Sequence, residues 1–182
     1  MMKAYHMTEI ISESYSLGVS ERIRQLQDMC NMYGDFRVAI ANKAPDGEVR
    51  WTKHYSVMEL WGSDKGLWLL SKANNRTIFP CELVLDIDKD PTPERLDNIC
   101  QQLEDLKIPY KAYFTGSRGY HIHIIDPGFL SLDAATAEKI KKVWIRTFDC
   151  DILKSSTKTM IAIENVEHWK TGIQKKLLRK YP

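Results

Sequence analysis

Two aspartates, Asp86 and Asp88, stand at the end of the apolar run from Leu83 to Pro91. Read as a strand, this run directs both carboxylates to the same side, because side chains two residues apart share a face. Oxygen ligands at this spacing suit Mg²⁺ or Mn²⁺, and carboxylates at the end of an apolar strand are costly to hold without a cation. A core strand that ends in an acidic turn explains the same run equally well, and Asp90 fits that turn.

A glycine-flanked turn, Gly116–Gly119, follows further along the chain. Its backbone N–H groups and the guanidinium of Arg118 form a reasonable phosphate cradle. His121 comes two residues later, and its neighbour Arg118 favours a role as a donor to a phosphate or a ribose. His123 shares a strand face with His121, and for His123 we favour the half-buried polar face of an edge strand.

The elements that position these residues follow from the hydrophobic period, which is helical in some segments and alternating in others. Residues 1–19 carry no strong period and stay unassigned. We predict helices at 20–34, 56–73, 92–109 and 132–148, and strands at 36–40, 49–51, 83–91, 110–114, 120–125 and 159–164.

Three details of this pattern bear on the fold. The strand at 83–91, the helix after it and the strand at 110–114 form a βαβ unit, so we expect the two strands to be parallel neighbours. Gly62 and Gly66 weaken the middle of the helix at 56–73 and allow it to divide into two pieces. The basic tail at 174–180 is consistent with a helix.

Composition narrows the class of protein. The chain has 182 residues, 43% hydrophobic and 27% charged, with a net charge of +2, so it is not a polycation that binds nucleic acid by overall charge. Its four cysteines form no CxxC pair, which argues against a zinc knuckle or a disulfide framework and favours buried thiols of a reducing compartment. No apolar run has transmembrane length and no signal-peptide segment is seen, so we expect a cytoplasmic protein without a membrane partner.

The motifs, taken in order, resemble the small (catalytic) subunit of archaeo-eukaryotic primases. Residues 85–88 (LDID), 115–121 (TGSRGYH) and 168–172 (HWKTG) are similar to that family's hDhD, SGxRGxH and HxKTG-like motifs. The resemblance covers about residues 80–172, and residues 37–56 resemble the N-terminal portion of the family only loosely. Three motifs in the family's order are far more specific than any one of them.

The resemblance implies roles for the basic and hydroxyl residues of these motifs. Arg118 and His121 would hold the triphosphate of the incoming nucleotide, with Ser117 as a weaker contributor. His168 and Lys170 would form a second phosphate clamp.

The resemblance also implies a metal site for Mg²⁺ or Mn²⁺, with Asp86 and Asp88 as its first two ligands. The family carries a third metal carboxylate upstream of the last motif. We expect Asp151 to take this place, in preference to Asp149, with Glu164 as a further alternative.

The fold implied by the resemblance is α/β (α+β), a primase-like catalytic core. We expect one compact domain over 1–182, in which an N-terminal αβ module (1–80) packs on an RRM-like mixed sheet (81–182). The implied activity is that of a DNA primase or primase-polymerase, a template-directed nucleotidyltransferase. It would use a single-stranded DNA template and NTPs or dNTPs, with a primase large subunit or another replication protein as a potential partner.

Two alternatives stay open. A repair or end-joining polymerase of the same superfamily would share the metal site and differ only in its products. A non-catalytic module that binds nucleic acid would keep the fold, with Trp51, Trp61 and the basic tail serving for stacking and phosphate contact. Core packing is the commoner role for such tryptophans.

Overall fold

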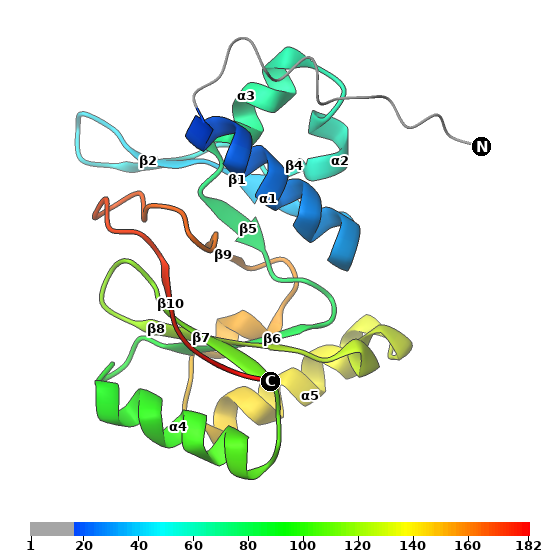
Figure 1. The fold of residues 1–182 in the computed structure, drawn as a ribbon, viewed down its shortest axis with the longest axis vertical. Coiled ribbons are helices and arrows are strands. Elements are labelled where there is room, and N and C mark those ends of the chain that lie inside the picture. Colours follow the sequence, from blue (N-terminus) through cyan, green and yellow to red (C-terminus); the bar gives the residue numbers. More distant parts are fainter. Residues whose placement is uncertain (1–16) are drawn as a thin grey trace.

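The structure is a computed structural model that describes residues 17–182. Of the segment left unassigned from the sequence (1–19), residues 1–16 therefore lie outside the described residues. The chain forms two stacked modules, each a β-sheet with its own helices (Figure 1). Among the described residues, no helix is long and apolar enough to cross a bilayer.

The first module is a four-stranded antiparallel sheet of order β4-β1-β5-β9, with a separate hairpin, β2-β3, and three helices. Up to residue 77 it contains α1 (Leu17–Tyr33), β1 (Arg37–Ala39), β2 (Ala41–Lys43), β3 (Val49–Trp51), β4 (Tyr55–Ser56), α2 (Val57–Leu60), α3 (Asp64–Lys72) and β5 (Asn75–Thr77). Its last strand, β9 (Met160–Ala162), comes from much later in the chain.

Helix boundaries in this module follow local capping chemistry. Ser56 and Ser63 each accept a hydrogen bond from the backbone N–H three residues on, so the predicted helix at 56–73 is divided into α2 and α3. Gly34, at φ +81°, ends α1 and donates to the carbonyl of Cys30. The predicted helix start at Ser20 is wrong, because α1 already begins at Leu17.

The second module is a four-stranded sheet of order β10-β7-β8-β6, in which every hydrogen-bonded pair is antiparallel. Helices α4 and α5 cover its lower face (Figure 1). Its elements are β6 (Glu82–Ile87), α4 (Pro93–Asp105), β7 (Tyr110–Phe114), β8 (Tyr120–Ile125), η1 (Pro127–Ser131), α5 (Ala134–Thr147), η2 (Ile152–Ser155) and β10 (Lys176–Tyr181).

Two expectations for this sheet are corrected. β6 and β7 run parallel, but β8 lies between them, because β8 returns from β7 through a tight turn and pairs antiparallel with both. β8 is therefore a central strand and not the expected edge strand.

The basic tail is also corrected, since residues 176–181 form strand β10 and not a helix. β7 would otherwise be an open edge, and pairing with β10 satisfies its backbone groups. Because β10 extends the sheet beside β7 and not beside β6, the RRM-like detail of the prediction is not confirmed. The mixed α/β class is confirmed.

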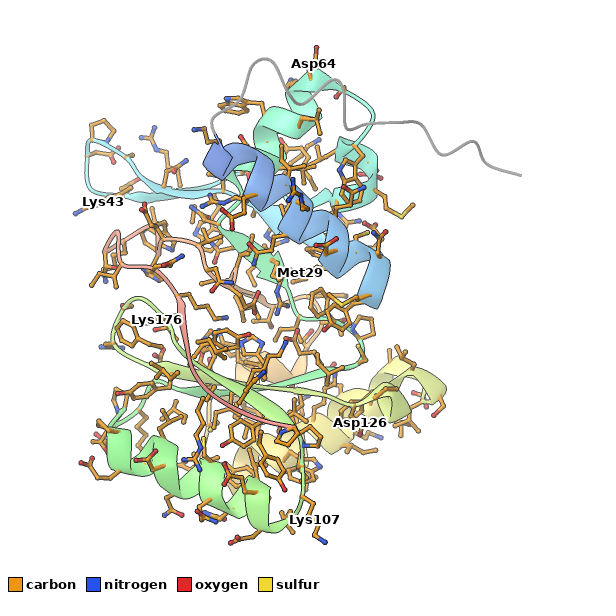
Figure 2. The ribbon with its side chains drawn as sticks, viewed as in Figure 1. Met29, Lys43, Asp64, Lys107, Asp126 and Lys176 are labelled. Carbon is orange, nitrogen blue, oxygen red and sulfur yellow. The ribbon has the colours of Figure 1, made fainter. Side chains whose placement is uncertain are left out.

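The modules meet through the face of the second sheet that points away from α4 and α5. Ile78, Val84 and Ile161 form a small apolar contact there. Figure 2 shows side chains filling the layer between the modules. Beside the apolar contact lies a set of buried charged and imidazole side chains, the buried ionic cluster. It consists of Arg76, Glu82, His123, Glu164 and Lys175.

Candidate active site

One pocket of about 350 Å³ gathers the residues of all three sequence motifs. It lies where the ends of β6, β8 and β9 approach the loop before β10. Seven side chains named from the sequence line it, namely Asp86, Asp88, Ser117, Arg118, His121, His168 and Lys170. Thr115, Lys154 and Ala162 complete the wall.

Strand β6 positions the two aspartates in the pocket. Leu83, Leu85 and Ile87 pack into the core below the sheet, and Asp86 therefore faces the other module, where it is 3% exposed. Asp88 follows the last residue of the strand and is exposed. The pair thus combines one buried and one exposed carboxylate.

The register of β6 and β8 sets the first histidine beside the first aspartate. Asp86 and His121 are cross-strand partners, and Nε2 of His121 lies 3.4 Å from Oδ1 of Asp86. Such cross-strand neighbours are close enough to interact. The sheet itself therefore assembles these two groups.

Gly119 lets the phosphate-cradle turn approach the end of β6. A Cβ at this position would lie 2.6 Å from Oδ1 of Asp88 and 2.8 Å from the carbonyl oxygen of Ile87. No side chain larger than hydrogen fits without a shift of this backbone. Within the turn, the N–H of Ser117 donates to Oγ1 of Thr115 at 3.4 Å, so part of the cradle's donor capacity is already used.

The loop of the third motif packs directly on this turn. Gly116 has φ +83°, and a Cβ there would lie 2.3 Å from the carbonyl oxygen of Ile173 and 3.0 Å from Cβ of His168. The hydroxyl of Thr171 donates to the carbonyl of Gly116. The two expected phosphate clamps are therefore one connected wall of the pocket.

Asp86 is held as a carboxylate although it is buried. Burial raises its pKa, but His121 and the ammonium of Lys154 together lower the pKa of Asp86 to about 2. Nζ of Lys154 lies 3.2 Å from Oδ2 of Asp86. The carboxylate is thus ionised at neutral pH with one cation beside it.

His121 is neutral at the same pH. Its burial, followed by the charge of Lys175, lowers its pKa to about 4, against the opposing effect of Asp86. Within the described part of the chain, its Nδ1 is buried without a hydrogen-bond partner. An imidazole in this state has donor or acceptor capacity left for a ligand.

The donor set fits a hard divalent cation. Among the described residues, Oδ1 of Asp86 is buried without a hydrogen-bond partner, which is costly for a charged oxygen. The exposed carboxylate of Asp88 lines the same pocket. Oxygen ligands on one side of an open pocket are those that Mg²⁺ or Mn²⁺ prefers.

None of the three candidates for the third metal carboxylate lines this pocket. Asp151 begins η2, where its carboxylate accepts from the N–H of Leu153 at 3.0 Å. Asp149 is exposed and lies near Lys89. Glu164 is part of the buried ionic cluster. The structure therefore brings two of the expected carboxylates together and not the third.

The buried ionic cluster includes a group that could hold a metal by geometry, because ligand atoms of Glu82, His123 and Glu164 lie within 4.8 Å of one another. Two cations already occupy the space. Arg76 donates to both oxygens of Glu82 at 2.8 Å and to Glu164 at 2.7 Å, and Nζ of Lys175 lies 3.3 Å from Glu164. Two carboxylates facing two cations leave little attraction for a further ion.

His123 belongs to this cluster and not to a half-exposed face. Its Nδ1 lies 2.6 Å from Glu82, and its Nε2 lies 3.0 Å from the ammonium of Lys175. A ring nitrogen that faces an ammonium must be the acceptor, which fits a neutral ring. Burial and then Lys175 lower the pKa of His123.

Sequence reasoning missed Lys154, which no motif includes. It follows Ile152 and Leu153 and precedes a polar run at 155–158 without a helical or alternating period, so nothing local distinguishes it from a surface lysine. Only the fold of η2 against β6 places it in the pocket.

The two tryptophans named for stacking differ in surroundings. Trp61 packs against the core of the first module, as its commoner role predicts. Trp51 lies on β3 and is 47% exposed.

Comparisons with known proteins agree with this picture. The chain is 32% identical over 85 residues to the DNA primase small subunit PriS of Archaeoglobus fulgidus, an alignment that covers 38% of this chain and 25% of that protein. The similarity thus spans about a quarter of the relative's length. No protein-family model matches the chain.

The fold is similar to a solved structure, the polymerase domain of Ligase D from Mycobacterium tuberculosis in complex with DNA. The TM-score is 0.57 at 13% sequence identity, and the match covers 89% of this chain and 83% of that chain. Together the two comparisons confirm the resemblance to archaeo-eukaryotic primases and the primase-polymerase type of fold.

Proposed function

We propose that this protein is a template-directed nucleotidyltransferase that adds nucleotides to a 3′-hydroxyl on a single-stranded DNA template, as a DNA primase or primase-polymerase does. The observation that carries the proposal is the meeting of three separated motifs around one pocket of about 350 Å³. Carboxylates on one wall and cations on the other match the needs of phosphoryl transfer, which depends mostly on positioning and charge neutralisation.

The cationic wall would bind the triphosphate of an NTP or dNTP. Arg118 is exposed at the pocket, and its planar guanidinium can donate two parallel hydrogen bonds to a phosphate. Lys170 and His168 approach from the adjoining loop, where the N–H of Lys170 donates to Nδ1 of His168. Ser117 and the neutral ring of His121 offer further hydrogen bonds.

The carboxylate wall, Asp86 with Asp88, would hold Mg²⁺ or Mn²⁺. When bound, such an ion neutralises charge on phosphate oxygens and favours attack by a hydroxyl. In the transfer, the 3′-hydroxyl loses its proton to solvent, its oxygen forms a bond to the α-phosphorus, and the bond from that phosphorus to pyrophosphate breaks. The chain's own residues orient the triphosphate for this attack, and no covalent intermediate with the protein is needed.

A primer-synthesis and extension assay tests the proposal, with labelled nucleotides, single-stranded DNA and Mg²⁺ or Mn²⁺. Replacing Asp86 or Asp88 by Asn should lower incorporation by roughly a hundredfold or more, about 2.7 kcal/mol of transition-state stabilisation. The matched control is Asp90→Asn, since Asp90 is exposed outside the pocket at φ +48°, a conformation that Asn tolerates. Wild-type incorporation by both D86N and D88N would refute the site.

A second candidate is a polymerase that only extends existing ends. It shares the pocket and the fold, which is similar to the polymerase domain of Ligase D over 89% of this chain and 83% of that chain. Circular single-stranded DNA separates the two, because it has no 3′-end. Products on the circle show de novo priming, and products that need an added primer show extension. Binding of DNA without incorporation would favour the non-catalytic module.

A further inference from the structure

Lys154 is a pocket residue that none of the three motifs contains. Its Nζ lies 3.2 Å from Oδ2 of Asp86, and its side chain is 16% exposed. It lines the pocket together with Arg118 and Lys170, the cations expected to bind phosphate. Unlike those two, it stands on the carboxylate side.

Backbone hydrogen bonds hold Lys154 in this place. The N–H of Asp151 donates to the carbonyl of Asp86 at 3.1 Å, and the N–H of Lys154 donates to the carbonyl of Asp151 at 3.1 Å. The hydroxyl of Thr159 ties the far side of the turn to Leu153 at 2.6 Å. The turn that carries the lysine is therefore anchored to the residue that the lysine neutralises.

The two oxygens of Asp86 have different surroundings. Oδ2 faces the ammonium of Lys154. Oδ1 is buried and, among the described residues, has no hydrogen-bond partner. One oxygen thus faces the fixed ammonium, and the other faces Nε2 of the neutral His121 ring at 3.4 Å without a hydrogen bond of good geometry.

The opposite wall lacks the carboxylate that a second ion would need. Two divalent ions about 3.5–4 Å apart share bridging ligands. Within the described chain, only Asp86 and Asp88 bring carboxylates to the pocket, and β9 contributes Ala162, which has none.

We propose that Lys154 supplies, as a fixed ammonium, the charge that a second metal ion supplies in a two-ion site, so that this pocket binds a single divalent ion through Asp86 and Asp88. A lysine ammonium is a compact point charge that can contact both a carboxylate and a phosphate. Its part in nucleotide transfer rests on the proposed function. Its effect on metal binding does not.

Removing Lys154 should change the metal affinity in the opposite direction from the removal of a purely structural ion pair. If Lys154 only stabilised the fold of the pocket, its removal would loosen the site and weaken metal binding. As a fixed cation beside the metal ligands, it repels the ion, and its removal should tighten metal binding. At an effective dielectric constant near 20, a charge a few ångströms away easily accounts for a tenfold change.

The test measures Mn²⁺ binding to the full chain by calorimetry and by electron paramagnetic resonance, without nucleotide or DNA. Wild type should bind one equivalent at the pocket, and D88N should lose it. Lys154→Met should bind Mn²⁺ about tenfold more tightly, and Lys154→Arg, which keeps the charge, should stay near wild type. Lys158→Met is the matched control, because this exposed lysine of the same segment lies outside the pocket. Circular dichroism checks that each variant is folded.

Incorporation assays on the same variants give the second readout. K154M should lose incorporation by roughly a hundredfold despite its tighter Mn²⁺ binding, and K154R should retain most of it. Two equivalents of Mn²⁺ in the wild type, or a K154M affinity equal to or weaker than that of wild type, overturns the inference. If no variant incorporates nucleotides while the Mn²⁺ results hold, the proposed function fails and the single-ion site stands.

A gain-of-site variant completes the design. Ala162→Asp combined with K154M replaces the fixed cation by a third carboxylate in the same pocket, and it should raise the Mn²⁺ stoichiometry from one to two. A folded double variant that still binds one equivalent contradicts the assignment of Lys154 to the second cation position.

Discussion

The surroundings of single atoms decide what this pocket can bind. Asp86 keeps one oxygen beside Lys154 and one without a partner among the described residues. The neighbouring ring of His121 is neutral because burial keeps it so. Arg118, in contrast, is exposed, and within the described chain it makes no ion pair. These side chains divide the pocket into a carboxylate side, where we propose that a metal ion binds, and a cationic side, where we propose that phosphate binds.

The proposed role of Arg118 in phosphate binding can be tested by a single substitution. Replacing it by Ala should weaken binding of a non-hydrolysable nucleoside triphosphate by about tenfold or more, because hydrogen bonds to charged groups contribute about 1.5–3 kcal/mol. Stability should change by less than about 0.5 kcal/mol, since the side chain is exposed. Calorimetric titration measures the affinity, with Arg146→Ala, an exposed arginine of α5, as the control. Wild-type affinity in R118A would remove Arg118 from the site.

Spacing in the sequence was enough to predict which residues of each motif share a face. Asp86 and Asp88 needed only the two-residue period of strands, whereas His121 was chosen over His123 because Arg118 lies near it. Lys154 could not be found in this way, because its partner lies far away in the sequence and its own segment has no period. The role of Asp151 could not be predicted from its residue type either, because an aspartate suits both the N-cap of η2 and a metal site.

At the scale of elements, the site depends on how closely the turn before β8 approaches the end of β6. Ala at Gly119 would bring a Cβ within 2.6 Å of the Asp88 carboxylate. We expect Gly119→Ala to lower metal-dependent incorporation at least tenfold and to cost about 1–3 kcal/mol of stability, as overpacking does.

The control is Gly62→Ala, because nothing lies within 4 Å of a Cβ at that position. Denaturant unfolding and the incorporation assay measure both effects. If G119A keeps full activity with an unchanged unfolding midpoint, the close approach of this turn to β6 is not needed for activity or stability.

Most elements were predictable from local patterns, and their pairing was not. Thr92 and Pro93 begin α4 as their chemistry requires, and the predicted strand at 49–51 forms as β3. The order of strands depends on competition for partners across the sheet. Thus β8 displaced the expected β6–β7 pair, and the basic tail became β10 because β7 offered an open edge.

At the scale of the molecule, the buried ionic cluster joins the two modules. Arg76 extends from β5 of the first module to Glu82 of β6 in the second. His123 touches the cluster with both ring nitrogens. Removing one member of such a cluster is costly because the remaining charges stay buried. The cluster therefore couples the stability of the two modules.

His123 makes this coupling depend on pH. Its pKa in the folded protein is below the ordinary 6.5, so below that pH the unfolded chain binds more protons than the folded one. The free energy of unfolding should therefore fall as pH decreases from about 6.5 towards the folded pKa of His123, by at most about 1.4 kcal/mol per pH unit for this group. Urea unfolding between pH 7.5 and 5 measures the slope.

The matched variant is His123→Asn, whose amide nitrogen can keep the donor to Glu82 while losing the titration. Its slope over the same range should be smaller than that of the wild type. His121 contributes with the same sign and remains in the variant, so the slope should decrease and not vanish. An equal slope in both proteins would show that His123 is not the titrating group.

Strand β9 has a consequence for the order in which the chain can fold during synthesis. Strand β5 (75–77) pairs on one side with β1 and on the other with β9 (160–162). Ile163 and Val166, which follow β9, complete the core of the first module. A growing chain therefore carries an open strand edge and an incomplete core until residues 160–166 have been made, and such edges are prone to wrong pairing. Although its helices come first, the N-terminal module cannot finish folding until β6, α4, β7, β8 and α5 of the second module have been made.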